Sequence, residues 1–326
     1  MYKDHKIAVV VPAYNEEVLI RPTLETIPEY IDVIYSVDDG SIDATLEVMR
    51  KVASNDSRIN IIQHSQNKGV GAAISTGYKQ CVKDQIDITV VMAGDNQMPP
   101  EYVPDLLDPI INNIADYAKA NRFNSPEFQT GKTEGLTTWR LIGNLVLSFL
   151  TKISTGYWHI MDSQNGYSAI SLYALTSIDL DKIYPKYGYC NDLLVKLNVS
   201  NIMVIDVPIF PTYGEEKSKI KYIPYISRVS QLLLRNFIWR IKTKYLLLEF
   251  HPFVFLYLSS LVLMPLGIGL FIFSLSYLFI IGNLLLFQAG LSFILIFLGF
   301  LGLYLAMIFE LKYNSGLNIS NETDKT

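Results

Sequence analysis

The stretch Ile7-Ala8-Val9-Val10-Val11-Pro12-Ala13-Tyr14-Asn15-Glu16 joins a short apolar run to a polar turn. Such a run, bounded by turn residues, is typical of a buried β-strand. Similar runs recur along the amino-terminal third of the chain, with helical patterns between them. The predicted strands are Ile7–Val11, Val33–Val37, Ile59–Ile62 and Ile88–Met92, and the predicted helices are Glu17–Tyr30, Ala44–Ala53, Gly71–Val82 and Pro100–Asn113. This alternation predicts an α/β fold with a parallel, doubly wound sheet that binds ligands beyond the carboxyl ends of its strands.

Polar turns follow the first two predicted strands. The first is Pro12-Ala13-Tyr14-Asn15-Glu16 and the second is Val37-Asp38-Asp39-Gly40-Ser41. Either turn alone is explained by ordinary turn chemistry, since Pro, Asn, Asp and Gly all favour turns. Together, at neighbouring strand ends, they offer carboxylates, backbone groups and an aromatic ring suited to holding a base and a ribose.

A third turn, Met92-Ala93-Gly94-Asp95-Asn96-Gln97, follows the fourth predicted strand. The Asp95 carboxylate and the Gln97 amide oxygen are ligands that suit a hard divalent cation shared with substrate phosphates. The alternative is that these residues cap the loop without a metal.

These three motifs, in this order and at this spacing, resemble the family 2 glycosyltransferases of the GT-A fold. The resemblance is to the branch that contains the dolichyl-phosphate mannose synthases and polyprenyl-phosphate glucosyltransferases, and it extends from about Ile7 to Ile220. It implies a Rossmann-like, mostly parallel sheet flanked by helices. It also implies an inverting transfer of a hexose, mannose or glucose, from a GDP- or UDP-sugar to a polyprenyl or dolichyl phosphate at the cytoplasmic face of a membrane.

The resemblance also assigns roles to the residues of the three turns. Asp95 and Gln97 are expected to hold Mg²⁺ or Mn²⁺ on the diphosphate of the donor. Ala93 stands where the family usually has an Asp, so one potential metal ligand is missing. The residues expected to contact the nucleotide sugar are Pro12, Tyr14, Glu16, Val37, Asp39 and Asp95.

Further matching segments imply an acceptor site. Arg122 follows a predicted fifth strand within Ala115–Phe123, and Arg140 and Asn144 lie at the start of a helix. These three residues are expected to bind the lipid phosphate, since guanidinium groups fit phosphate oxygens in bidentate fashion.

Two other segments resemble parts of the family's pocket. Asp162 and Gln164 are expected to position the substrates, because an acceptor phosphate is largely ionised near neutral pH and needs no general base. Asp192 is a weaker pocket candidate, with a solvated carboxylate at a helix start as its alternative. Lys217 and Lys219 match a loop that closes over the diphosphate and neutralises charge on the leaving group.

The carboxyl-terminal part is unlike the rest, because Pro252 to Phe309 contain no Asp, Glu, Lys or Arg. A membrane-crossing helix needs about 20 apolar residues, so we predict crossings near Pro252–Phe279 and Leu285–Phe309. Gly282 and Asn283 provide the turn between them. A buried hairpin in a soluble core is the alternative, although soluble helices normally keep a polar face.

The segment before the first crossing is basic and apolar. Its cations are Arg228, Arg235, Arg240, Lys242 and Lys244. We expect an interface helix there, and the positive-inside rule then places the catalytic domain and both termini in the cytoplasm of a two-helix, multi-pass membrane protein. The expected organisation is a catalytic domain over residues 1–225, the interface helix over 226–250, the anchor over 251–310 and a polar tail over 311–326.

Other classes of protein are less well supported. The net charge of −4 gives no reason to expect a nucleic-acid partner, and Cys81 and Cys190 lack the spacing of a zinc site. A processive polysaccharide synthase is one alternative, but its Gln-x-x-Arg-Trp element is absent from the sequence. A membrane-anchored nucleotide-sugar-binding protein without catalysis is another, suggested by Ala93. The sequence does not distinguish GDP from UDP, dolichyl from undecaprenyl phosphate, or one oligomeric state from another.

Overall fold

The computed structural model describes residues 1–123, 138–209, 222–248, 250–283 and 285–324. The chain divides into two compact units, Met1–Ile238 and Trp239–Thr326. Each unit has its own internal packing.

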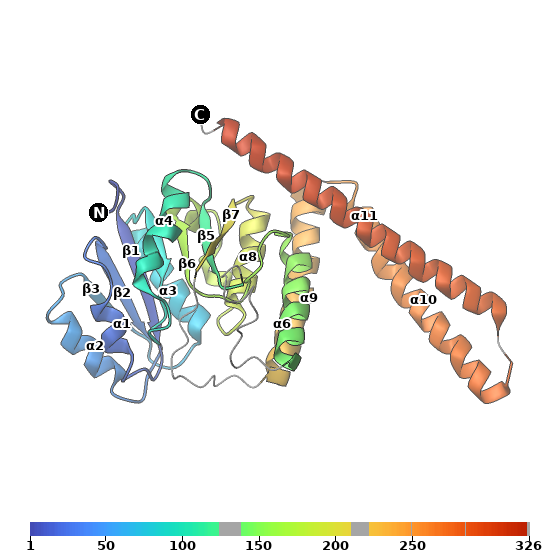
Figure 1. The fold of residues 1–326 in the computed structure, drawn as a ribbon, viewed down its shortest axis with the longest axis horizontal. Helices are drawn as coiled ribbons and strands as arrows, with labels where there is room; N and C mark the ends of the chain where they lie inside the picture. Colours follow the sequence, from blue (N-terminus) through green and yellow to red (C-terminus); the bar gives the residue numbers. More distant parts are fainter. Residues whose placement is uncertain (124–137, 210–221, 249, 284, 325–326) are drawn as a thin grey trace. The chain divides into compact units, whose positions relative to one another are not determined.

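The first unit is built on one seven-stranded sheet with the order β3-β2-β1-β4-β6-β5-β7 (Figure 1). All neighbours are parallel except that β6 runs antiparallel to β4 and β5, which confirms the predicted mostly parallel sheet. The strands are β1 Ile7–Ala13, β2 Val33–Asp38, β3 Ile59–Gln63, β4 Ile88–Val91, β5 Tyr117–Asn121, β6 Ser168–Ser171 and β7 Val204–Pro208.

Helices cover both faces of this sheet. Those of the first unit are α1 Ile20–Glu25, α2 Thr45–Ala53, α3 Val70–Lys83, η1 Pro100–Tyr102, α4 Val103–Ile111, α6 Thr138–Thr155, α7 Leu172–Thr176, η2 Leu180–Lys182, α8 Tyr189–Val199 and the greater part of α9 Tyr222–Arg240.

Alternate residues of β1 point into two separate apolar cores. Val9 and Val11 face the core formed with α1, α2 and α4, whereas Ala8 and Val10 face the core formed with α3, α7 and α8. A strand buried on both faces reads as a continuous apolar run, which is why the first strand was evident from sequence. Because helices cover both faces of the sheet, the polar turns lie at the carboxyl ends of its strands.

The predicted helix Glu17–Tyr30 is wrong in length, because α1 covers only Ile20–Glu25. Before it, Asn15 has a φ of +55°, which is outside the helical range, and the Glu16 amide donates to Thr45 Oγ1 at 2.8 Å. After it, Pro28 lacks the amide hydrogen that a further helical turn would need. The polar turn thus extends into the segment predicted as helix.

The second unit contains the end of α9, a π-helix over Ile241–Leu248 and the long helices α10 Val254–Ile281 and α11 Leu286–Asp324. The stretches Val254–Ile281 and Leu286–Tyr313 are long and apolar enough to cross a membrane, and only 17% of each most apolar window is buried. Gly282 ends α10 with a φ of +79°, at the predicted turn. The two helices therefore fit the predicted membrane spans, and α11 continues as a helix into the predicted polar tail.

The basic segment before α10 does not present all its cations to solvent. Arg240 and Lys244 are buried within the second unit, whereas Arg228, Arg235 and Lys242 are exposed. Arg240 pairs with Glu310 of α11, and both side chains have no exposed surface. Two of the five cations of this segment are therefore buried, and the interface helix itself stays a prediction.

Candidate active site

The three polar turns meet at the carboxyl edge of the sheet, around the end of β1. Pro12 lies beside Val37 in the β1–β2 register, and the Asp39 amide donates to the Ala13 carbonyl at 2.9 Å. On the other side, the Gly94 amide donates to the Pro12 carbonyl at 3.1 Å. Three segments separated by more than 20 residues in sequence are thus joined by backbone hydrogen bonds. Pro12 and Val37 are themselves buried, so the surface they form is largely that of their backbone.

Side-chain hydrogen bonds link the first two turns. The Asn15 amide donates to Ser41 Oγ at 3.0 Å, and the Ile42 amide donates to Asn15 Oδ1 at 3.0 Å. These bonds hold the turn so that Tyr14 remains 41% exposed. An exposed aromatic ring next to a backbone-lined edge is suited to stacking against a planar base.

Asp39 is buried, and both of its carboxylate oxygens have partners within the chain. Oδ1 lies 2.7 Å from His64 Nδ1 and accepts the Lys68 amide at 2.9 Å, while Oδ2 accepts the Gly69 amide at 2.7 Å. Asp39 therefore positions the segment that leads into α3. Its direct contact with a nucleotide stays a prediction.

The preceding residue, Asp38, is a buried carboxylate that the sequence did not single out. Its Oδ1 accepts the Ser41 amide at 3.1 Å, and its Oδ2 has no hydrogen-bond partner among the residues that the structure describes. A buried carboxylate oxygen without a donor is costly, so Asp38 is held at the end of β2 at an energetic cost.

The turn after β4 is compact. Asp95 Oδ1 accepts the Gln97 amide at 3.2 Å, and Asn96 between them has a φ of +57°. A Cβ on Gly94 would lie 3.0 Å from Ala13 Cβ and 3.1 Å from Ile20 Cδ1. The close approach of this turn to β1 therefore favours a glycine at position 94, because a larger residue would require its neighbours to shift by a few tenths of an ångström.

Two oxygen-bearing side chains of this turn suit a divalent cation. Within the described ranges, His, Cys, Asp and Glu side chains nowhere form a group of three that would hold a metal. The side-chain oxygens that this turn offers to a cation are those of the Asp95 carboxylate and the Gln97 amide, and Ala93 offers only a methyl group. That donor set fits Mg²⁺ or Mn²⁺, cations that take most of their remaining ligands from phosphates and water.

Arg122 and Asp162 form a bidentate ion pair beyond the end of β5. Arg122 Nε lies 2.7 Å from Asp162 Oδ2, Nη2 lies 3.1 Å from Oδ1, and the Arg122 amide also donates to Oδ2 at 3.2 Å. Asp162 has no exposed surface, whereas the Arg122 side chain is 39% exposed. The paired geometry orients one edge of the guanidinium inward. Sequence reasoning named both residues but not their pairing.

Gln164 is held by amide hydrogen bonds. Its Nε2 lies 3.0 Å from Asn191 Oδ1 on α8, and Asn191 Oδ1 also accepts from Thr151 Oγ1 of α6 at 3.3 Å. Gln164 is therefore bonded to α8 and is connected to α6 through Asn191, a supporting residue that the sequence did not reveal.

Asp192 is a structural carboxylate. It accepts the Tyr184 amide at 2.7 Å, Asn236 Nδ2 at 2.8 Å and Lys196 Nζ at 2.5 Å, and it is 2% exposed. The alternative of a solvated carboxylate at the helix start is therefore wrong. Its bonds connect α8 to α9 within the first unit.

The remaining sequence candidates are less fully described. Arg140 and Asn144 lie in α6, of which only the backbone is described at these positions. Lys217 and Lys219 lie outside the described residues. Their roles stay predictions.

We expect Arg122→Ala to lower the free energy of unfolding by about 2 kcal/mol, because it leaves the buried Asp162 carboxylate without its counter-ion. Denaturation of the full chain in detergent measures this. Adding Asp162→Asn to the same chain should restore much of the loss, because the buried charge is then removed. Lys182→Ala, which breaks an exposed pair with Asp179, is the matched control and should change little. If Asp162→Asn restored none of the lost stability, the assignment of Arg122 and Asp162 as a buried ion pair would be contradicted.

Residues 8–176 match the protein-family model described as glycosyl transferase family 2. The chain is 31% identical over 225 residues to UDP-N-acetylglucosamine–dolichyl-phosphate N-acetylglucosaminyltransferase of Methanococcus voltae, covering 65% of this chain and 88% of that protein. It is 27% identical over 248 residues to dolichol-phosphate mannosyltransferase of Pyrococcus furiosus, covering 70% and 64% of the two chains. It is 28% identical over 209 residues to undecaprenyl-phosphate mannosyltransferase of Micrococcus luteus, covering 63% and 82%.

Among solved structures, the chain resembles glucosyl-3-phosphoglycerate synthase from Mycobacterium tuberculosis, crystallised with Mn²⁺, UDP and phosphoglyceric acid. The TM-score is 0.53 at 19% identity, with 73% of this chain and 78% of that one covered. At this identity the likeness concerns the fold.

Proposed function

Because this chain belongs to glycosyltransferase family 2, we propose that it transfers a hexose from a nucleoside diphosphate sugar to the phosphate of a polyprenyl lipid. The observation that carries this proposal is the joining of the three polar turns at one sheet edge, in a chain that ends in two helices fit to span a membrane. The relatives act on dolichyl or undecaprenyl phosphate by their names, which supports a lipid phosphate as acceptor.

The donor is proposed to bind along the β1–β2 edge. Exposed Tyr14 would stack on the base, and Glu16, Asp39 and the backbone at Pro12 and Val37 would surround the nucleoside. Both GDP- and UDP-sugars suit such a site, since backbone and ring contacts bind either base.

The diphosphate is proposed to lie over the turn after β4. Asp95 and Gln97 would hold a Mg²⁺ or Mn²⁺ ion, and when bound this cation would act as a Lewis acid that neutralises charge on the nucleoside diphosphate as it leaves. Lys217 and Lys219 are proposed to neutralise the same charge from a separate segment.

The acceptor phosphate is proposed to meet Arg122, Arg140 and Asn144. A phosphate monoester is largely ionised at neutral pH, so its oxygen attacks the anomeric carbon without a general base, and the configuration inverts. In this scheme Asp162 orients Arg122 through the bidentate pair, and Gln164 lines the pocket. The roles of Asp162 and Gln164 are thus to position groups rather than to move protons.

We propose that the catalytic unit and both termini lie in the cytoplasm, with the two apolar helices in the bilayer. The exposed cations Arg228, Arg235 and Lys242 precede the first span, as the positive-inside rule requires of a cytoplasmic flank. An embedded polyprenyl tail would then keep the acceptor phosphate at headgroup depth. Holding the phosphate near the site lowers the entropic cost of bringing the two reactants together.

The test is to incubate the purified, detergent-solubilised chain with a panel of labelled nucleotide sugars, divalent metal and polyprenyl phosphate. Label in a monoglycosylated lipid phosphate supports the proposal and names the sugar. Label in a polymer would instead indicate a processive synthase. Tight nucleotide-sugar binding with no labelled product would indicate a binding protein without catalysis.

Ala93→Asp is expected to tighten metal binding, because it adds a carboxylate where the family usually has one. We expect the Mn²⁺ concentration for half-maximal activity to fall about tenfold, the effect of roughly 1.4 kcal/mol of added ligand binding. Glu101→Gln, at an exposed carboxylate in η1, is the matched control for a change of one charge near the turn. A metal requirement that stays the same or rises would argue against a cation at this turn.

A further inference from the structure

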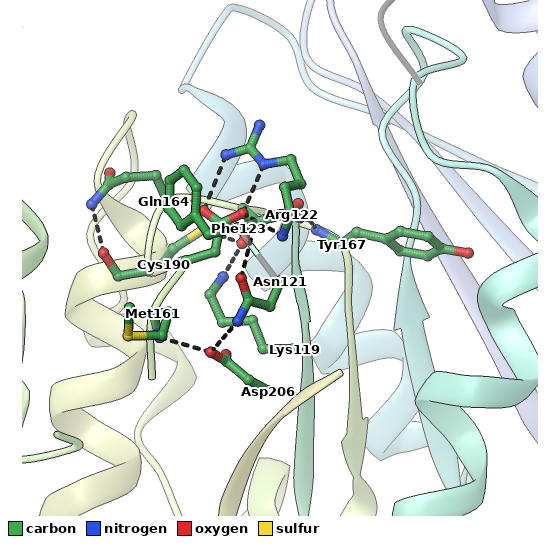
Figure 2. A network of polar contacts seen from close by, with 12 residues as sticks. Lys119, Asn121, Arg122, Phe123, Met161, Gln164, Tyr167, Cys190 and Asp206 are labelled. Carbon is green, nitrogen blue, oxygen red and sulfur yellow. Dashed lines mark hydrogen bonds and ion pairs between the residues drawn. The ribbon is translucent and has the colours of Figure 1, made fainter. Parts of the chain in front are cut away.

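A second carboxylate, Asp206, lies close to the Arg122–Asp162 pair. It belongs to β7 and lies beside Lys119 of β5 in the parallel register. Its Oδ2 accepts Asn121 Nδ2 at 2.9 Å and the Met161 amide at 2.7 Å (Figure 2). One carboxylate oxygen thus joins β5 to the segment that follows α6.

The two partners of Asp206 are the immediate neighbours of the ion pair. Asn121 directly precedes Arg122, and Met161 directly precedes Asp162. Asn121 also accepts the Phe123 amide through Oδ1 at 2.9 Å, so its side chain connects Asp206 to the residue that follows Arg122 (Figure 2). A shift of Asp206 would therefore move both halves of the pair.

Asp206 occupies this place at an energetic cost. Its Oδ1 is buried without a hydrogen-bond partner among the described residues, and burial raises the pKa of the Asp206 carboxyl above its ordinary value, with Lys119 acting in the opposite direction. A structural link between β5 and β7 does not need such a group, because the backbone ladder already joins the strands. A cost of this kind is typical of a group kept for the geometry of a site.

We infer that Asp206 is a positioning residue for acceptor binding, since it holds the two chain segments whose next residues, Arg122 and Asp162, form the bidentate pair. This inference rests on the proposed function, in which Arg122 meets the lipid phosphate. It assigns no contact between Asp206 and substrate.

The test uses Asp206→Ala in the full chain, with steady-state kinetics against polyprenyl phosphate and against the nucleotide sugar. We expect the KM for polyprenyl phosphate to rise about tenfold, the equivalent of losing one hydrogen bond to a charged group. The KM for the nucleotide sugar and kcat at saturating acceptor should change less than about twofold, because no donor contact is altered. Asp206→Asn keeps one acceptor oxygen and should recover most of the acceptor affinity.

Two further variants keep the outcome decisive. Asn121→Ala breaks the same link from the other side and should show the same selective rise in the KM for polyprenyl phosphate. It replaces Asp206→Ala in the test if that variant fails to fold. Asp116→Asn alters a buried carboxylate just before β5, at the opposite end of the strand, and should leave both KM values as in the parent chain. An unchanged acceptor KM, or equal rises for both substrates, would overturn the inference. A parent chain that forms no lipid product would overturn the proposed function instead.

Discussion

Replacing Asp95 with alanine is expected to reduce sugar transfer about a thousandfold, which corresponds to roughly 4 kcal/mol of lost transition-state stabilisation. Asp95 is the only carboxylate in the turn Met92–Gln97, and position 93 offers no second one. Without it, the proposed cation would depend on the amide oxygen of Gln97 and the substrate alone. The negative charge that grows on the leaving diphosphate would then be poorly compensated.

Asp95→Asn makes this test more specific. The amide keeps an oxygen that can accept the Gln97 N–H bond, 3.2 Å long in the parent chain, so the turn keeps its shape while the charge is lost. Rates of lipid glycosylation at saturating donor, acceptor and Mn²⁺ provide the measurement, and Glu101→Gln serves again as the control. Full activity in Asp95→Asn would contradict the proposal that a metal ion assists the transfer.

Glu310→Ala is expected to lower the free energy of unfolding by about 4 kcal/mol, because it removes the carboxylate that pairs with the fully buried Arg240. In the second unit, Glu310 accepts hydrogen bonds from Tyr245 Oη at 2.8 Å and Tyr257 Oη at 2.6 Å, besides pairing with Arg240. The substitution therefore removes three interactions of one buried carboxylate at once. Thermal and denaturant unfolding in detergent measure the loss.

A double variant separates charge from packing at this cluster. Arg240→Met with Glu310→Leu replaces the pair by apolar side chains of similar size, and such replacements of buried ion pairs are often neutral or stabilising. We therefore expect the double variant to be much more stable than Glu310→Ala. Lys312→Ala, at an exposed position on the same helix, is the control and should change little. A double variant as unstable as the single one would contradict this account.

The sheet and the two long helices were predictable because their signals are local. The buried strands are continuous apolar runs, and the membrane spans are long charge-free stretches, so neither depends on a distant partner. The short strands β6 and β7 were not predicted. Each has four or five residues, and each exists because it pairs with strands far away in the sequence. The antiparallel pairing of β6 with β4 and β5 likewise could not be predicted from the local sequence pattern.

The polar turns at the carboxyl edge were also predictable, but the partners of their side chains were not. Asp39 was expected to contact the nucleotide sugar and Asp192 was a weaker pocket candidate, but the internal hydrogen bonds that each of them accepts were not foreseen. Asn191 and Asp206 gave no signal, since a single Asn or Asp in a helix or strand has no distinguishing spacing. Their significance arises from what lies next to them in space.

The amino-acid sequence by itself determined the class of sheet, the turns at its edge, the family and the apolar helices, because each rests on residue types at short spacing. The tertiary structure alone decided which charges are exposed and which are paired: Arg122 with Asp162 across 40 residues, and Arg240 with Glu310 across 70. The physical reason is that a charge becomes structural only when the folded chain removes it from water, and removal from water depends on segments that the local sequence does not contain.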